Sequence, residues 1–324
     1  MGIGAMIAAI LLLPEIWPGL GKLRATFVSY IRMIAPSMML GFLIGGLIER
    51  YVPRQYISKA LAQRKKRTIL SSALLGFLMS ACSHGILALS IELYKKGAST
   101  PVVVSFLLAS PWANLPITII LFGFFGWKAL YIVLGALFVA FTTGLLFQSL
   151  EKRGFIESNP HTVFDAPDFS IGADVKRRLR ESHFSRAGLV SDLRQIFAGS
   201  VALARMTLGW ILIGIGISSL AATFIPPAFF KTVMGPSPGG LLGTLGFAAV
   251  LEVCSEGTAP MAFEIFRQTG AFGNTFVFLM AGVVTDYTEI GLLWANIGRK
   301  TALWLPAAAV PQVVLLGIMA NCIF

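Results

Sequence analysis

The sequence has few charged residues, and this scarcity excludes most soluble folds. Only 13% of its 324 residues are charged, whereas 56% are hydrophobic. Soluble domains carry about 25% charged residues. Several apolar stretches exceed the roughly 18 residues that a helix needs to cross a bilayer, and no series of short alternating strands suggests a β-barrel. The composition therefore predicts an all-α polytopic membrane protein. Its expected partner is the lipid bilayer that surrounds it.

Cysteines and nucleotide-binding motifs are equally scarce. Three cysteines do not provide the disulfide framework of a small secreted domain. The chain carries no Walker motif, no dinucleotide fingerprint and no haem or zinc-enzyme signature. We therefore expect no cofactor and no enzymatic activity, and an ATP-driven pump would need a separate ATPase subunit.

Acidic residues are also in short supply, since 26 Lys and Arg oppose 15 Asp and Glu. The basic excess gathers beside apolar segments, with seven Lys or Arg in residues 50–67 and eight in residues 152–194. Basic loops beside membrane spans mark the cytoplasmic side, so we predict that loops 50–67 and 151–195 are cytoplasmic. Nucleic acid is not an expected partner, because basic and aromatic residues do not interleave.

The polar, Arg-rich stretch at 151–195 divides the apolar segments into two groups. We expect a short N-terminal segment at 1–24, a first transmembrane repeat at 25–150, the basic loop, and a second transmembrane repeat at 196–324. Residues 2–14 lack the charged leader of a cleavable signal peptide. We interpret them as a short first span or its remnant.

A duplicated Cys-Ser-x-Gly motif relates the two groups, and a glutamate follows ten residues after each cysteine. The matched residues are Cys82, Ser83, Gly85 and Glu92 in the first half, and Cys254, Ser255, Gly257 and Glu264 in the second. Both motifs interrupt strongly apolar segments. This agreement in order and spacing predicts an internal repeat, which in transporters is either parallel or inverted.

The basic loops favour the inverted form. Three full spans cannot join loops 50–67 and 151–195 if both lie on one side, so one segment between them must enter and leave by the same face. The best candidate is 68–94, which the motif interrupts, and 101–126 ranks second. Each half then has three spans and one interrupted re-entrant helical hairpin, and this odd number of crossings inverts the second half.

The two Cys-Ser breaks would then approach each other near the membrane midplane and line a central site, where non-helical backbone is tolerated. Thiols prefer soft species such as Cu(I), Zn(II) or trivalent arsenic, whereas a cysteine can also pack as a small apolar residue. His84 and Glu256 share one repeat position, and each suits a metal ligand, a proton carrier or a buried ion pair. The predicted substrate-binding residues are Cys82, Ser83, His84, Asn114, Cys254, Ser255 and Glu256, and the predicted metal ligands are Cys82, His84, Cys254 and Glu256.

A second interruption follows in each half. In the first half Asn114 lies among prolines, each of which removes a backbone hydrogen bond, so Asn114 either repairs the break or faces the cavity. In the second half Asp286 and Glu289 lie within four residues, and two acids are hard to bury unpaired in a membrane. Asp286, Glu289 and His84 are therefore our candidates for proton or ion coupling.

The glutamates that follow the two cysteines have a simpler interpretation. Glu92 is close in sequence to Lys95, and Glu264 is close to Arg267. We interpret both as helix-end salt bridges near the membrane surface.

The duplicated motif also resembles a known family. The Cys-Ser motif precedes a Gly-Ala turn at residues 97–98 and a segment that contains Ala109-Ser110-Pro111, Asn114 and Pro116. In these features the chain, from about residue 25 to its end, resembles the predicted-permease family that contains the organoarsenical efflux permease ArsP and the YraQ-type permeases. The resemblance implies a multi-pass permease of the plasma membrane, in a family whose substrates cover organoarsenicals and metals.

We therefore predict a secondary transporter that exports a small thiol-reactive solute, either a trivalent organoarsenical or a soft metal ion. One alternative is a channel-like conduit for a small sulfur-containing or neutral solute. Another is a membrane thiol redox relay, in which Cys82 and Cys254 cycle through a disulfide. A homo-oligomer is compatible with the sequence.

Overall fold

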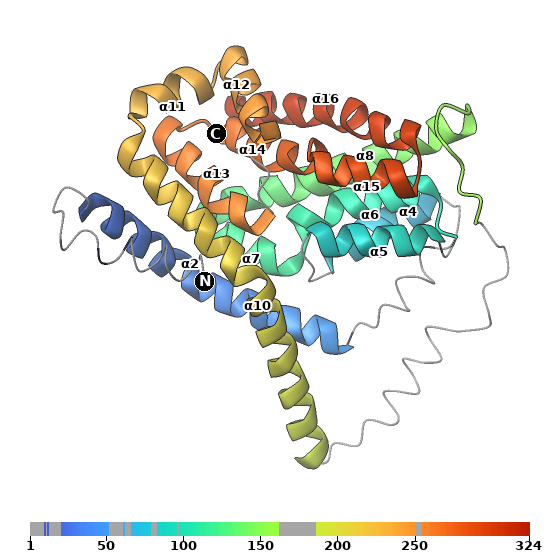
Figure 1. Ribbon diagram of the computed structural model, residues 1–324, viewed down its shortest axis with the longest axis horizontal. Coiled ribbons are helices and arrows are strands. Elements are labelled where there is room, and N and C mark those ends of the chain that lie inside the picture. Colours follow the sequence, from blue (N-terminus) through green and yellow to red (C-terminus); the bar gives the residue numbers. More distant parts are fainter. Residues whose placement is uncertain are drawn as a thin grey trace.

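The computed structural model describes residues 21–51, 66–78, 83–95, 97–161, 186–250 and 255–324, together with residues 10, 12 and 61. Every regular element of this part of the chain is a helix (Figure 1). The all-α prediction is therefore confirmed over the described residues. The expected first span at 2–14 lies outside them, apart from two positions.

The helices fall into two series. The first comprises α2 (Gly21–Tyr51), α4 (Lys66–Phe77), α5 (Ser83–Lys95), α6 (Thr100–Ala113), α7 (Leu115–Phe125), the short 3-10 turn η2 (Gly126–Lys128) and α8 (Ala129–Lys152). The second comprises α10 (Arg186–Phe224), α11 (Pro227–Met234), α12 (Pro238–Val250), α13 (Ser255–Thr269), α14 (Phe272–Val284), α15 (Tyr287–Asn296) and α16 (Arg299–Ile323). α13 and α15 each begin 172 residues after α5 and α7, so the interruptions recur at matching positions.

The Gly-Ala pairs of the repeated pattern end equivalent helices. Gly97 has φ 97° and Gly270 has φ 69°, a left-handed conformation that glycine adopts without a Cβ penalty. After α5, the Ala98 N–H donates to the Leu93 carbonyl at 3.0 Å, as in a Schellman cap. After α13, the Gly270 N–H donates to the Phe266 carbonyl at 2.8 Å. The same local signal thus stops both helices.

In each half, two consecutive short helices pack beside the helix that follows them: α4 and α5 beside α6, and α12 and α13 beside α14. The Ser105 hydroxyl of α6 donates to the Ile69 carbonyl of α4 at 3.2 Å, and Gly76 farther along α4 lies against Ser110, so α4 runs parallel to α6. α5 returns in the opposite direction, because its C-terminal end lies at the start of α6. In the second half, Thr244 contacts Asn274 and Phe247 stacks on Phe278, so α12 runs parallel to α14.

The equivalent helices α8 and α16 run in opposite directions. In α8, Tyr131 lies against Phe324, with ring centroids 5.6 Å apart, and Thr143 accepts a hydrogen bond from Gln312 at 3.0 Å. As the residue number rises along α8 it falls along α16. These two helices are therefore antiparallel.

Within the described residues, four helical stretches are long and apolar enough to cross a membrane, whereas the sequence of the whole chain predicts six spans. They are Gly21–Ile44, Leu115–Lys152, Phe272–Asn296 and Arg299–Ile323, and the bent pair Ile211–Phe224 with Pro227–Met234 makes a fifth if it counts as one span. Shorter apolar helices, such as Thr100–Ala113, hold much of the remaining apolar sequence. The described residues thus fit a multi-pass membrane protein built partly of half-length helices.

The expected basic loop contains the start of a helix. α10 begins at Arg186, inside the stretch expected to be loop up to residue 195. Its first turns are held against α2, since Arg50 forms an ion pair with Asp192 at 2.7 Å. At the other end of α10, Pro226 and Pro227 end the helix and start α11 at an angle of 108°.

The loop after α8 ties the two halves together. Glu157 accepts hydrogen bonds at 3.0 Å from the backbone N–H groups of Lys300 and Thr301, at the start of α16. Its carbonyl accepts from the Thr100 hydroxyl of α6. Partial burial raises the pKa of Glu157, but these donors outweigh burial and hold the pKa below its ordinary value of 4.5. Glu157 thus caps α16 as a carboxylate.

Candidate functional site

Both duplicated cysteines immediately precede a helix in the sequence. α5 begins at Ser83 and α13 begins at Ser255. Cys82 and Cys254 lie outside the described residues, and for Ser83, His84, Ser255 and Glu256 only the helical backbone is described. The predicted contacts of these six side chains therefore stay predictions.

The glycine of the second motif has a structural role in the described residues. Gly257 is buried in the first turn of α13, and a Cβ on Gly214 of α10 would lie 2.0 Å from the Gly257 carbonyl oxygen. Such close backbone approach requires glycine on the facing helix. α10 is thereby held directly against the start of α13.

Asn114 caps the second break of the first half. Its side chain is 3% exposed, accepts a hydrogen bond from the Ile117 N–H at 2.9 Å, and donates to the Ser110 carbonyl at 3.0 Å. The side chain thus joins the end of α6 to the start of α7, as expected for repair of the proline break.

Asp286 occupies the matching position in the second half, 172 residues later. Its Oδ1 atom accepts from the Glu289 N–H at 3.0 Å, in the geometry of an N-cap for α15. The Glu289 side chain is 1% exposed in the first turn of that helix, where the helix dipole favours negative charge. The two candidate coupling acids are therefore neighbours at one helix start.

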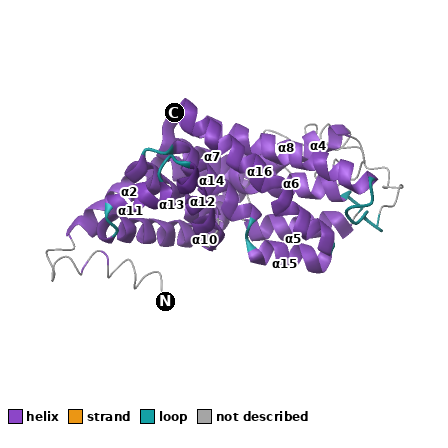
Figure 2. Cartoon of the chain, turned by 90° about the horizontal axis from the view of Figure 1, so that it is seen from above, coloured by secondary structure: helices purple, strands orange, loops and turns teal. Residues whose placement is uncertain are grey.

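The starts of four short helices point toward the middle of the molecule. α5 and α15 lie side by side and meet at their C-terminal ends, where the Tyr94 hydroxyl donates to the Ile297 carbonyl at 3.4 Å (Figure 2). α7 and α13 meet likewise near their C-terminal ends, since Phe125 of α7 packs on Phe266 of α13 with ring centroids 6.1 Å apart. The N-termini of these four helices therefore lie at the ends that point away from the two contacts. Because α6 leads from the end of α5 to Asn114, and α14 leads from the end of α13 to Asp286, the two caps lie between these contacts.

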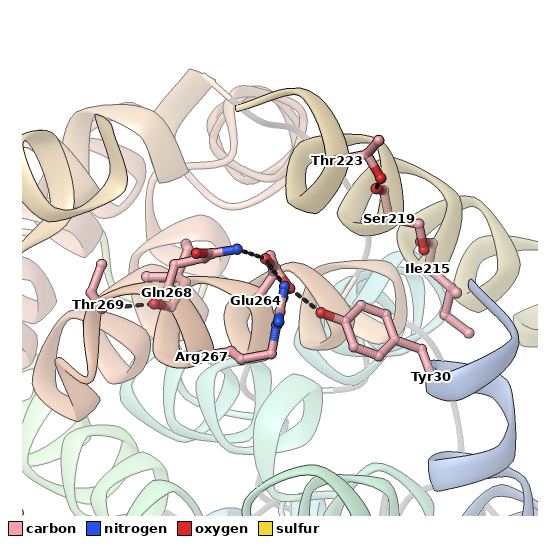
Figure 3. A network of polar contacts seen from close by, with 9 residues as sticks. Tyr30, Ile215, Ser219, Thr223, Glu264, Arg267, Gln268 and Thr269 are labelled. Carbon is pink, nitrogen blue, oxygen red and sulfur yellow. Dashed lines mark hydrogen bonds and ion pairs between the residues drawn. The ribbon is translucent and has the colours of Figure 1, made fainter. Parts of the chain in front are cut away.

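A buried polar network that the sequence revealed only in part surrounds Glu264 in the C-terminal half of α13 (Figure 3). Glu264 is fully buried and accepts hydrogen bonds from the Tyr30 hydroxyl of α2, from Arg267 at 2.9 and 2.8 Å, and from Gln268. The predicted pairing of Glu264 with Arg267 is present. The Tyr30 contact joins residues 234 positions apart, which no local pattern indicates.

No group of three or more His, Cys, Asp or Glu side chains that could hold a metal ion occurs among the described residues. Of the predicted metal ligands, Cys82 and Cys254 lie outside the described residues, and the side chains of His84 and Glu256 are not described. A soft metal ion at the predicted site would be a transported substrate and not a resident cofactor.

Comparison with known proteins agrees with the helical, membrane-spanning architecture. A family model, ArsP_1, described as a predicted permease, matches residues 20–322. The UPF0718 protein YcgR of Bacillus subtilis (strain 168) is 23% identical over 307 residues, which cover 91% of this chain and 95% of that protein. The UPF0718 protein MJ0584 of Methanocaldococcus jannaschii is 25% identical and covers 86% of this chain and 89% of its own. No solved structure matches.

Proposed function

Since the chain belongs to the ArsP_1 family of predicted permeases, we propose that it exports a small thiol-reactive solute across the plasma membrane. The proposed substrate is a trivalent organoarsenical or a soft metal ion. The observation that carries this proposal is the inward convergence of four helix starts, two of which directly follow a cysteine.

The proposed topology is an inverted repeat. Two features support it: the interruptions recur after 172 residues, and the equivalent helices α8 and α16 are antiparallel. An inverted repeat places equivalent helices in opposite directions across the membrane. Loops 50–67 and 151–195 would then both be cytoplasmic, as their basic residues favour.

The proposed re-entrant hairpins are α4–α5 and α12–α13. The first helix of each pair runs inward, α4 parallel to α6 and α12 parallel to α14. The second helix returns in the opposite direction, so neither pair needs to cross the membrane. Their tips, at residues 78–83 and 250–255, would meet from opposite faces. Backbone that is not helical at such depth needs polar surroundings, which a solute pathway provides.

Cys82 and Cys254 would bind the solute jointly at these tips. A helix start favours the thiolate form of a cysteine, and the thiolate is the form that binds soft metals and arsenic. His84 and Glu256 would adjust the charge of the site, with Asn114, Ser83 and Ser255 as polar contacts. Asp286 and Glu289 would supply a negative centre for ion or proton coupling.

Transport into everted membrane vesicles tests the proposal. We expect vesicles that contain the parent protein to accumulate a trivalent methylarsenical, and a proton gradient to increase this accumulation. Cys82→Ser and Cys254→Ser should each abolish it. Cys322→Ser is the matched control, because Cys322 is an exposed cysteine at the other end of the second half, and it should transport normally.

Two outcomes contradict the proposal in different ways. Parent vesicles that fail to accumulate the methylarsenical, Cu(I) and Zn(II) would refute a thiol-reactive substrate. Equal accumulation by the parent and by the Cys82→Ser/Cys254→Ser double variant would refute the thiol site while leaving a permease.

A further inference from the structure

The carboxylate of Glu264 connects α2 of the first half with α13 of the second. Glu264 is 0% exposed, whereas the Arg267 side chain that pairs with it is 44% exposed. Tyr30, the third member, is 4% exposed. The cation of this cluster therefore reaches the surface of the protein, while the anion does not.

Protonation of Glu264 is incompatible with the observed set of bonds. Both carboxylate oxygens accept hydrogen bonds, from Tyr30, Arg267 and Gln268 (Figure 3). Arg267 can only donate, so a hydrogen on the carboxyl group would displace it. Conversely, once Arg267 swings away, an ionised Glu264 would lack a cation in apolar surroundings, which strongly favours uptake of a proton.

The elements around Glu264 offer few competing charges. α7, α12 and α14 contain no charged residue, and neither does the part of α10 beside Glu264, residues 211–224, which includes Ile215, Ser219 and Thr223 (Figure 3). Farther along α10, Arg205 is exposed. Lys128 lies over the ring of Phe266, with Nζ 4.8 Å from the centroid, on a neighbouring part of the cluster. The remaining charged residues near Tyr30 on α2 and on the short helix α11 are exposed: Lys22, Arg24, Arg32 and Lys231.

We propose that Tyr30, Glu264 and Arg267 form the proton-binding site that couples a pH gradient to the movement of α13. This inference rests on the proposed transport function. In the proposed step one proton passes from water to Glu264, and the Arg267 guanidinium moves from the carboxylate into water. The Tyr30 hydroxyl also releases the carboxyl group, no covalent bond changes apart from the O–H bonds of the transferred proton, and the cluster gains one positive charge.

α13 provides the connection to the solute site. It begins at Ser255, next to Cys254, and reaches Glu264 nine residues later, about 14 Å along the helix axis. Pro260 lies between them and leaves a gap in the backbone hydrogen bonds, where a helix bends readily. Release of the Tyr30 contact on protonation would free the outer end of α13 from α2 and let it tilt about Pro260.

The first half supplies a matched control. Glu92 occupies the equivalent position and Lys95 the equivalent of Arg267, but both side chains are exposed. An exposed carboxylate can lose its partner to water without taking a proton. The proposal therefore assigns proton coupling to Glu264 and not to Glu92.

Infrared difference spectroscopy of the purified protein in lipid nanodiscs tests the site without any transported solute. On acidification, we expect a carbonyl band of a buried protonated carboxyl group in the parent and in Glu92→Gln. The intensity of this band should fall in Glu264→Gln, where only a contribution from another buried acid such as Glu289 can remain. A band that persists unchanged in Glu264→Gln would overturn the proposal.

Two further variants keep the proposal testable if Glu264→Gln fails to fold. Arg267→Gln removes the cation, so we expect the carboxyl band to appear at a higher pH than in the parent. Tyr30→Phe should also make the band appear at a higher pH, because the ionised carboxylate loses a hydrogen-bond donor. Absence of both effects in the folded variants would also overturn the assignment.

Vesicle transport then links the site to function. Stimulation of methylarsenical uptake by a proton gradient should be lost in Glu264→Gln and retained in Glu92→Gln. Gradient stimulation that survives in Glu264→Gln would contradict coupling. If the parent takes up no methylarsenical, the substrate proposal fails, whereas the infrared result still decides whether Glu264 binds the proton.

Discussion

The two halves of the chain share a scaffold and differ in their charges. Helix starts, glycine stops and polar caps recur at matching positions, as in the pairs α5 with α13 and α7 with α15. Asn114 is replaced by Asp286, however, and exposed Glu92 is replaced by buried Glu264. The comparison suggests that duplication preserves the backbone breaks, while the charged chemistry concentrates in the second half.

The largest expected difference concerns the two glutamates. Glu264→Ala removes the acceptor of a buried network and leaves Arg267 and Tyr30 without their partner, which should cost about 3 kcal/mol of unfolding free energy. Glu92→Ala at an exposed position should change stability little. Denaturant unfolding of the detergent-purified variants, followed by tryptophan fluorescence, measures both. Equal destabilisation would show that the halves do not differ in this way.

A smaller difference is expected at the glycines by which the first helix of each half packs. A Cβ on Gly214 would lie 2.0 Å from the Gly257 carbonyl oxygen, whereas a Cβ on Gly41 would lie 3.0 Å from the Pro116 carbonyl oxygen. Gly214→Ala must push two backbones apart, at a cost of about 1 to 3 kcal/mol. Gly41→Ala should cost clearly less in the same unfolding assay, and the reverse order would contradict the described packing.

The equivalent caps Asn114 and Asp286 allow the structural effect of a cap to be separated from the effect of its charge. Asn114→Ala and Asp286→Ala each remove an N-cap and should each cost about 1 kcal/mol. Asp286→Asn keeps the cap acceptor and should preserve stability while it impairs vesicle transport. Full transport by Asp286→Asn would show that the acid at this position serves only as a cap.

The smallest expected effect is at the loop that joins the halves. The folded pKa of Glu157 lies below 4.5, so its stabilising contribution is complete above that value and is lost as the pH falls through the folded pKa. Glu157→Gln should reduce stability by about 1 kcal/mol at neutral pH. The gap between parent and variant should narrow as the pH falls to acidic values. Unfolding curves at several pH values measure the gap, and a gap that widens on acidification would contradict the cap.

The local sequence was sufficient to predict those structural features that depend only on residues close to one another in the chain. The prolines around Asn114 predicted the break between α6 and α7, whereas the breaks predicted at the Cys-Ser motifs include residues outside the described part of the chain. The Glu264–Arg267 pair follows from their spacing of three residues on one helix. In each case the partners lie within about one helical turn.

Long-range packing explains what the sequence did not reveal. Glu92 and Glu264 have similar local sequences, yet only Glu264 is covered, because Tyr30 of α2 lies against the neighbouring Phe263. The helical start of α10 at Arg186 depends partly on the pair of Asp192 with Arg50, which is 142 residues away. Such contacts arise from the tertiary arrangement and leave no periodic signal in the chain.

The central claim is that the two Cys-Ser breaks form one solute site. Intact-mass spectrometry after incubation with a trivalent methylarsenical measures this directly, because one arsenic atom that bridges two thiols adds a single methylarsenic group. We predict one such adduct in the parent and in Cys322→Ser, and its loss in both Cys82→Ser and Cys254→Ser. Retention of the adduct in either single variant, or two independent adducts in the parent, would contradict a shared site.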